Sequence, residues 1–159
     1  MVKNQDCKFM RLAIKKAKSG IRRGQTPFGA CIVKNNRVIA CEHNIVWKNI
    51  DITAHAEITA LRAACNKVKQ IDLSGATIYS TCEPCPMCFS ACHWARISRI
   101  VYGVGIKDAK KFGFNELAIS NFKLKKLGKS KMQITAGLLM AENIKLFKFW
   151  QKQAKIKTY

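Results

Sequence analysis

Two short segments carry side chains that could bind and activate a metal ion. The first contains His55, followed two residues later by Glu57, and the second contains Cys85 and Cys88. One imidazole and two thiolates suit a single zinc ion and leave a fourth tetrahedral position open. A zinc ion with an open position binds water and lowers its pKa towards ~7, which gives a hydroxide nucleophile at neutral pH. The spacing therefore predicts a catalytic zinc centre held by His55, Cys85 and Cys88.

The spacing of the two cysteines is that of a helix start. Side chains three residues apart project from the same face of a helix. Pro86 fits the first turn, because the N–H that proline lacks would have no partner there. The free amides of a helix start also stabilise the negative charge of a thiolate. His55 begins another helical pattern, so we expect two helix starts to meet at the metal.

Glu57 favours a catalytic role for this metal over a structural one. Two residues after His55 on a helix, its side chain points away from the ligand and is free to face a substrate. A carboxylate beside the zinc-bound hydroxide can pass protons to the substrate nitrogen and the leaving amine. His-x-Glu combined with Pro-Cys-x-x-Cys is the signature of zinc deaminases that act on nucleobases. The alternatives are a redox pair or a structural zinc site completed by Cys82, Cys92 or His93.

The hydrophobic pattern predicts the elements that must position these residues. Helical periodicity occurs near the N-terminus, and two β-type runs meet at Asn35-Asn36, a dipeptide typical of a hairpin turn. Alternating helices and short strands favour a layered α/β domain. The predicted helices cover residues 9–18, 53–68, 86–96 and 141–154, with partly helical structure over 108–120. The predicted strands cover residues 30–34, 38–42, 76–80, 99–104 and 132–136.

Composition limits the classes of protein to which the chain can belong. Its 159 residues, 48% of them hydrophobic, suit one globular domain. The N-terminal residues lack the apolar core of a signal peptide, and no apolar run reaches the ~18 residues of a membrane span. We therefore expect a cytoplasmic protein with no membrane partner. The eight cysteines should then be reduced rather than paired in disulfides.

The net charge of +20 leaves two interpretations open. A strongly positive protein attracts phosphates, which suggests a nucleic-acid partner. However, the basic residues form no detached tail, and all those after residue 106 are lysines. Arginine is the better group for bidentate and stacking contacts with nucleic acid. A lysine-rich surface without a specific partner is therefore the alternative.

At the metal-binding segments the chain resembles the cytidine deaminase superfamily. Within it, the chain is similar to the branch of bacterial and plant guanine deaminases and tRNA adenosine deaminases. The similarity runs from residues 27–30 through 53–62 to 82–96 and 102–103. It implies a three-layer α/β/α fold with a central five-stranded mixed sheet, formed by residues 1–159 as one domain. It also implies one zinc ion per chain and a homodimer with the active site near the subunit interface.

Several details of the resemblance favour guanine deaminase. Residues 113–116 are similar to a Gly-Phe-acidic-acidic stretch of that family, which implies that Glu116 is a second catalytic carboxylate. In that family the C-terminal segment, here about residues 141–159, is exchanged between subunits, and its terminal tyrosine closes the partner's site. The resemblance thus implies these substrate-contacting residues: Asn44, Ala54, Phe28, Trp94 and Tyr159. The chain departs from the family at Ile52, where proline is usual, and at Asn115, where an acid is usual.

The expected reaction is hydrolysis of guanine to xanthine and ammonia. Guanine presents N1–H and an exocyclic amine on one edge, and both are donors that a carboxylate such as Glu116 complements. A tRNA adenosine deaminase is the first alternative and would account for the charge. A terminal Tyr159 lid, however, would obstruct a base that stays attached to its backbone. A cytosine or cytidine deaminase and a non-catalytic zinc-binding RNA module are the remaining alternatives.

Overall fold

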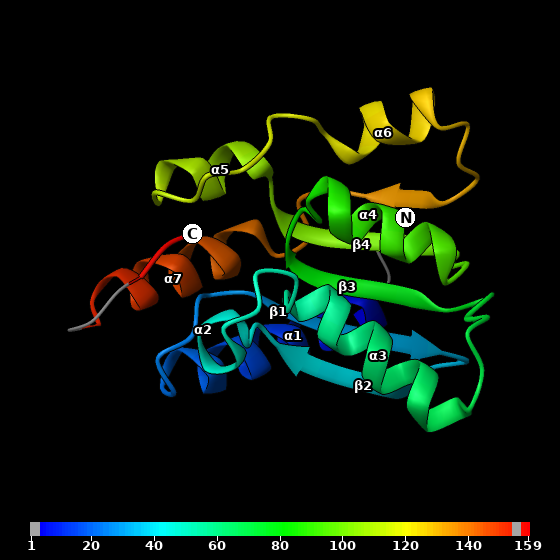
Figure 1. Cartoon of the computed structure of the whole chain (residues 1–159), viewed down its shortest axis with the longest axis horizontal. Helices are drawn as coiled ribbons and strands as arrows, with labels where there is room; N and C mark the ends of the chain where they lie inside the picture. Colours follow the sequence, from blue (N-terminus) through cyan, green and yellow to red (C-terminus); the bar gives the residue numbers. More distant parts are fainter. Residues whose placement is uncertain (1–3, 154–156) are drawn as a thin grey trace.

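The computed structural model describes residues 4–153 and 157–159, and its centre is one mixed sheet of five strands (Figure 1). The strand order is β2-β1-β3-β4-β5. Strand β1 pairs antiparallel with β2 and β3, whereas β3–β4 and β4–β5 are parallel pairs. The strands are β1 (Gly29–Lys34), β2 (Arg37–His43), β3 (Thr77–Cys82), β4 (Arg99–Val104) and β5 (Gln133–Thr135).

Helices cover both faces of the sheet and confirm the predicted three-layer α/β/α fold (Figure 1). Helices α1 and α7 contact each other on one face, and α3 and α4 lie side by side on the other. Short helices α2, α5 and α6 lie in the connections between these elements. Their bounds are α1 (Asn4–Ile21), α2 (Val46–Asn49), α3 (Ala56–Val68), α4 (Pro86–Trp94), α5 (Ile106–Lys111), α6 (Asn121–Leu127) and α7 (Met140–Gln151). No helix in the described part of the chain is long and apolar enough to cross a membrane.

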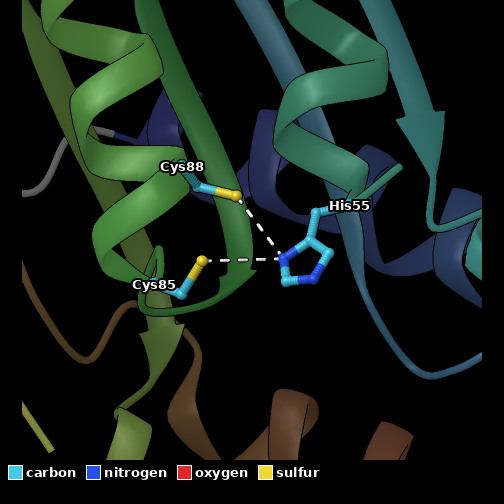
Figure 2. Close-up of side chains that lie close together, drawn as sticks. All are labelled: His55, Cys85 and Cys88. Carbon is cyan, nitrogen blue, oxygen red and sulfur yellow. Dashed lines mark hydrogen bonds between the residues drawn. The ribbon is translucent and has the colours of Figure 1, made fainter. Parts of the chain in front are cut away.

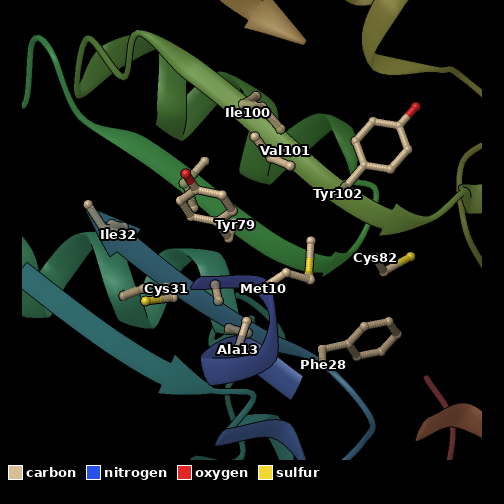
Figure 3. Packing of buried hydrophobic residues seen from close by; sticks show 14 of the residues in the cluster. Met10, Ala13, Phe28, Cys31, Ile32, Tyr79, Cys82, Ile100, Val101 and Tyr102 are labelled. Atoms are coloured by element: carbon tan, nitrogen blue, oxygen red, sulfur yellow. The ribbon is translucent and has the colours of Figure 1, made fainter. Parts of the chain in front are cut away.

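The core lies where α1 packs on the inner strands. Met10 and Ala13 of α1 are fully buried near Cys31 of β1 (Figure 3). Gly29 lies so close to the α1 backbone at Ala13 that a side chain there would collide with it. This contact holds the first helix directly against the first strand of the hairpin, and it needs a residue without a Cβ. All eight cysteines are free thiols in this structure.

Several predicted boundaries differ from the observed ones by a few residues, and the expected partly helical stretch 108–120 is helical only as far as Lys111. Two of the differences have local physical reasons. The first helix continues past Gly20 to Ile21, because Gly20 serves close packing rather than helix termination. A Cβ at residue 20 would lie 2.7 Å from Cγ of His43. Helix α3 begins three residues later than predicted, because His55 has extended backbone angles and occupies the N-cap position. The Asn35-Asn36 turn is confirmed, with φ of 50° and 59°, as a two-residue hairpin requires.

Candidate zinc centre and active site

The three predicted metal ligands come together at the starts of α3 and α4 (Figure 2). His55 is the N-cap of α3, Cys85 is the N-cap of α4, and Cys88 lies in the first turn of α4. His55 Nδ1 lies 3.6 Å from Sγ of Cys85 and 3.5 Å from Sγ of Cys88. Zinc bonds to nitrogen and sulfur at tetrahedral angles separate the two atoms by about 3.5 Å. The residues therefore fit one zinc ion, with a fourth position open.

The electrostatics of the cluster favour the thiolate form of Cys85, whereas the pKa of the buried Cys88 thiol is raised, first by its hydrogen bond to Cys85 and then by burial. The pKa of the Cys85 thiol is lowered to about 4, because the Cys88 thiol donates a hydrogen bond to it and His55 lies beside it. Its position at a helix N-terminus favours the thiolate in the same direction. Cys85 is thus prepared to bind a cation without a large cost of deprotonation.

Glu57 lies beside these ligands in the first turn of α3. Its side chain is buried, with Oε2 at 3.5 Å from Sγ of Cys88, and Oε1 accepts a 2.9 Å hydrogen bond from the Ser80 hydroxyl. Burial raises the pKa of the Glu57 carboxyl, which makes the protonated form more accessible. A carboxyl group held in one orientation and able to carry a proton is suited to proton transfer at the metal.

Asn44 and the C-terminal Tyr159 meet above the zinc ligands. Asn44 is fully buried, and its Oδ1 accepts a hydrogen bond of 3.1 Å from the N–H of Val46. Its Nδ2 donates to the hydroxyl of Tyr159. The Tyr159 ring lies 5.4 Å from the ring of His55, measured between centroids. In this structure Tyr159 therefore lies against the His55 imidazole of the same chain.

The predicted exchange of residues 141–159 between subunits concerns a segment that is only partly described. Helix α7 packs on β4 and α1 of its own chain, and its residues Leu146, Phe147 and Trp150 are buried there. Residues 154–156, which connect this helix to the Tyr159 segment, lie outside the described residues. The exchange stays a prediction.

Glu116 lies at the rim of the site on the segment that follows α5. Its side chain is partly buried, and this burial together with the charges of Cys85 and Glu57 raises its pKa to about 7. Glu116 is thus within electrostatic range of Cys85 and Glu57, and its catalytic role stays a prediction. A carboxyl group with this pKa can accept or donate a proton near neutral pH.

The other predicted substrate-contacting residues occupy different surroundings. Phe28 is buried, and the centroid of its ring lies 4.7 Å from that of Phe114. Ala54 is also buried, and its carbonyl accepts a hydrogen bond from Ile45 that shapes the loop before His55. Trp94, in contrast, is 82% exposed at the far end of α4. Nine residues of helix separate it from Cys85 by roughly 13 Å, so this chain does not bring Trp94 to its own zinc ligands.

Glu83 is a buried acidic residue that sequence analysis did not assign. Its carboxylate accepts hydrogen bonds from the backbone N–H groups of Ile106, at 3.1 Å, and Asn121, at 2.8 Å. The Asn121 side chain in turn donates to the carbonyl of Pro84. Glu83 thus connects the zinc-binding segment to both ends of the segment that carries Glu116. Its position two residues before Cys85 is the signal in the sequence that could have identified it.

Replacing Glu83 with glutamine is expected to lower the free energy of unfolding by about 1–3 kcal/mol. One acceptor oxygen would become an NH₂ group facing a buried backbone N–H, which leaves that donor without a partner. Urea unfolding of the zinc-loaded protein measures the effect. Glu42→Gln is the matched control, because its ion pair with Lys16 is half-exposed and worth less than about 1 kcal/mol. Equal stability of the two variants would contradict this role of Glu83.

Comparison with known proteins agrees with the fold and the metal site. Residues 3–104 match the family model of the cytidine and deoxycytidylate deaminase zinc-binding region. The match covers more than half of the chain and includes His55, Glu57, Cys85 and Cys88. The chain therefore belongs to the cytidine and deoxycytidylate deaminase family and is a zinc-dependent deaminase.

Relatives of two kinds are similar to the chain over nearly its whole length. Guanine deaminase of Bacillus subtilis is 36% identical over 155 residues, which covers 95% of this chain and 97% of that protein. A tRNA-specific adenosine deaminase of Buchnera aphidicola is 36% identical over 146 residues, covering 92% of this chain and 93% of that one. A solved structure in complex with 2,6-diaminopurine has a TM-score of 0.88 at 25% identity, covering 99% of this chain and 87% of that chain.

Proposed function

We propose that the chain hydrolyses free guanine to xanthine and ammonia. The observation that carries this proposal is the position of Tyr159 over the zinc ligands, with its hydroxyl bound to Asn44. A site covered in this way suits a small detached base, because a base attached to a polynucleotide backbone needs an open path. The similarity to Bacillus subtilis guanine deaminase over 95% of the chain supports the same substrate.

Each of the residues around the site would have a separate role in this reaction. Zinc, when bound, would supply an activated water. Water adds to C2 of guanine, the C2–N bond breaks, and the exocyclic amine leaves as ammonia. Glu57 would carry protons from the water to the ring nitrogen and the leaving amine. Glu116 would accept hydrogen bonds from the donor edge of guanine, and the Asn44 amide would bind the purine when the Tyr159 hydroxyl releases it.

Adenosine in tRNA is the second candidate substrate, and the charge of the molecule favours it. The net charge is +20, and the Buchnera tRNA-specific adenosine deaminase is as similar in identity as the guanine deaminase. Lys107, Lys111 and Lys123 line a surface cavity of about 450 Å³ beside Glu83. Lysines at this position could bind the phosphates of an RNA whose base enters the site.

A homodimer is part of the proposal. An apolar groove of about 570 Å³ lies between α3 and α4, lined by residues that include Ile58, Leu61, Ala91 and Trp94. A second copy of the chain bound at this face would bury the exposed Trp94 ring. The predicted contact of Trp94 with substrate would then be made in the site of the partner subunit. Light scattering of the wild type and of Trp94→Ala tests the dimer and this face.

Ammonia release by the zinc-loaded protein tests the substrate. The protein is offered guanine, with adenine, cytosine, cytidine and tRNA in parallel, and the products are separated by chromatography. We expect ammonia from guanine with xanthine as the product. No reaction with guanine but inosine in the tRNA would replace the proposed substrate by the second candidate.

Deleting Lys157–Tyr159 is expected to lower kcat/KM for guanine by about tenfold to a hundredfold. The deletion removes the phenol that covers the zinc ligands and therefore opens the site to water. Steady-state kinetics measure the effect, and the control is Lys152→Gln, which changes an exposed residue at the end of α7. A truncated protein as active as the wild type would show that Tyr159 does not close the site.

A further inference from the structure

We propose that Trp47 is the positioning residue that holds the C-terminal segment, Lys157–Tyr159, closed over the zinc ligands. Trp47 lies on α2, a four-residue helix that hydrophobic periodicity did not predict. Its side chain is half-buried, yet it is not part of the hydrophobic core cluster of the described residues. The contacts of its indole ring, rather than the stability of the core, therefore indicate its role.

The indole ring contacts the C-terminal segment twice. The Nζ atom of Lys157 lies 5.0 Å from the centroid of the Trp47 ring, which is a cation–π distance. The Tyr159 ring lies 6.5 Å from the indole at an interplanar angle of 58°, within the range of aromatic pairs. Trp47 thus binds a charged and an aromatic side chain of the same short segment.

The other rim of the site also binds this segment. The N–H of Asn115 donates a 3.1 Å hydrogen bond to the main-chain oxygen of Tyr159, and the centroid of the Phe114 ring lies 5.8 Å from that of the tyrosine ring. The segment therefore bridges the α2 rim and the rim formed by residues 112–116. The Asn115 hydrogen bond uses the backbone of the segment, so it is available to any terminal residue. Trp47 recognises the lysine and tyrosine side chains themselves.

Trp47 and Asn44 belong to the same turn of the chain. Asn44 Oδ1 accepts a hydrogen bond from the N–H of Val46. This bond fixes the start of α2 relative to the buried Asn44 side chain. The Asn44 amide and the Trp47 indole both contact Tyr159, the first at its hydroxyl and the second at its ring, so they face the same side of the chain. Tyr159 is consequently held at its hydroxyl by Asn44 and at its ring by Trp47, and both contacts must break when the segment opens.

Release of Tyr159 by a carboxypeptidase that removes C-terminal aromatic residues tests the proposal without any substrate. When opening is fast relative to cleavage, the rate reports the population of the open segment. Loss of both indole contacts in Trp47→Ala should raise the release rate by about tenfold. Lys157→Gln, which leaves α2 intact, should raise it by about two- to fivefold. Trp47→Phe keeps an aromatic face and should restore most of the protection.

Matched controls separate this effect from general destabilisation. Phe122→Ala removes a half-exposed ring of α6, and Lys152→Gln removes an exposed lysine; both should release Tyr159 at the wild-type rate, and all variants should keep the wild-type melting temperature to within a few degrees. Release from Trp47→Ala and Lys157→Gln at the rates of their controls would overturn the proposal.

The consequence for catalysis rests on the proposed function. If the segment closes over bound guanine, Trp47→Ala should lower kcat/KM for guanine by about tenfold through the same contacts, whereas Phe122→Ala should not change it. An unchanged kcat/KM in Trp47→Ala would show that Trp47 holds the segment only when no substrate is bound, and it would overturn the predicted effect on catalysis. A wild type that does not deaminate guanine would refute the proposed substrate, while the release of Tyr159 would still decide the role of Trp47.

Discussion

Replacing Glu57 with glutamine is expected to lower kcat by about 10²–10⁴-fold, the usual contribution of general acid–base catalysis. The substitution preserves the shape of the side chain and an acceptor for the Ser80 hydroxyl, which donates to it at 2.9 Å. It removes the group that can take up and release a proton beside the metal. The expected result is therefore a folded, zinc-loaded protein with almost no turnover.

Three measurements on the same preparation distinguish a loss of proton transfer from a loss of zinc or of the fold. Ammonia release reports turnover, elemental analysis reports zinc per chain, and circular dichroism reports the fold. Glu142→Gln is the control, because this carboxylate pairs with Arg11 on the surface and should leave all three measurements unchanged. Substantial turnover in Glu57→Gln would show that another group moves the proton, and Glu116 would be the next residue to replace.

Replacing Cys88 with alanine is expected to release the zinc ion, with at least a 10³-fold loss of zinc affinity, an estimate from the coupling of metal binding to folding. Cys88 is fully buried, and its sulfur lies 3.5 Å from the imidazole nitrogen that would share the metal. Because the metal connects the starts of α3 and α4, we also expect a lower melting temperature. Titration with zinc followed by thermal unfolding measures both effects.

The matched control for Cys88 is a cysteine outside the cluster. Cys65 lies on α3 and is half-buried, and Cys65→Ala should keep one zinc ion per chain. Cys85→Ala should behave as Cys88→Ala does, since each variant removes one of three protein ligands. A Cys88→Ala protein that retains one zinc ion per chain would refute the ligand assignment, whatever its stability.

The cysteine pair and the hairpin could be predicted from the sequence because their signals are local, whereas His55, 30 residues before Cys85, was joined to them through the deaminase signature. The spacing of Cys85 and Cys88 places both side chains on one turn of a helix, and Pro86 marks where that helix begins. The Asn35-Asn36 dipeptide determines the hairpin, since both residues tolerate the positive φ that the turn requires. Each of these inferences depends on neighbours within a few positions, where elementary backbone chemistry dominates.

Short elements could not be predicted in this way. Helix α2 has four residues and α6 has seven, and both lack the repeated apolar positions on which helical periodicity depends. Buried partners position α6 instead: Asn121 at its first residue binds Glu83 and Pro84 through hydrogen bonds across the chain. The distance of Trp94 from the zinc ligands, in contrast, follows from the nine residues of helix that separate it from Cys85.

The sequence by itself thus determined the chemistry of this protein: a His-Cys-Cys zinc cluster with a carboxylate beside it. Only the tertiary structure decided what surrounds that cluster. Asn44 and Tyr159 are 115 residues apart in sequence, and Ser80 reaches Glu57 from a different element. Such contacts form only when the helices and strands pack, because no local preference acts over that separation. The contacts that hold Tyr159 at the site therefore depend on packing.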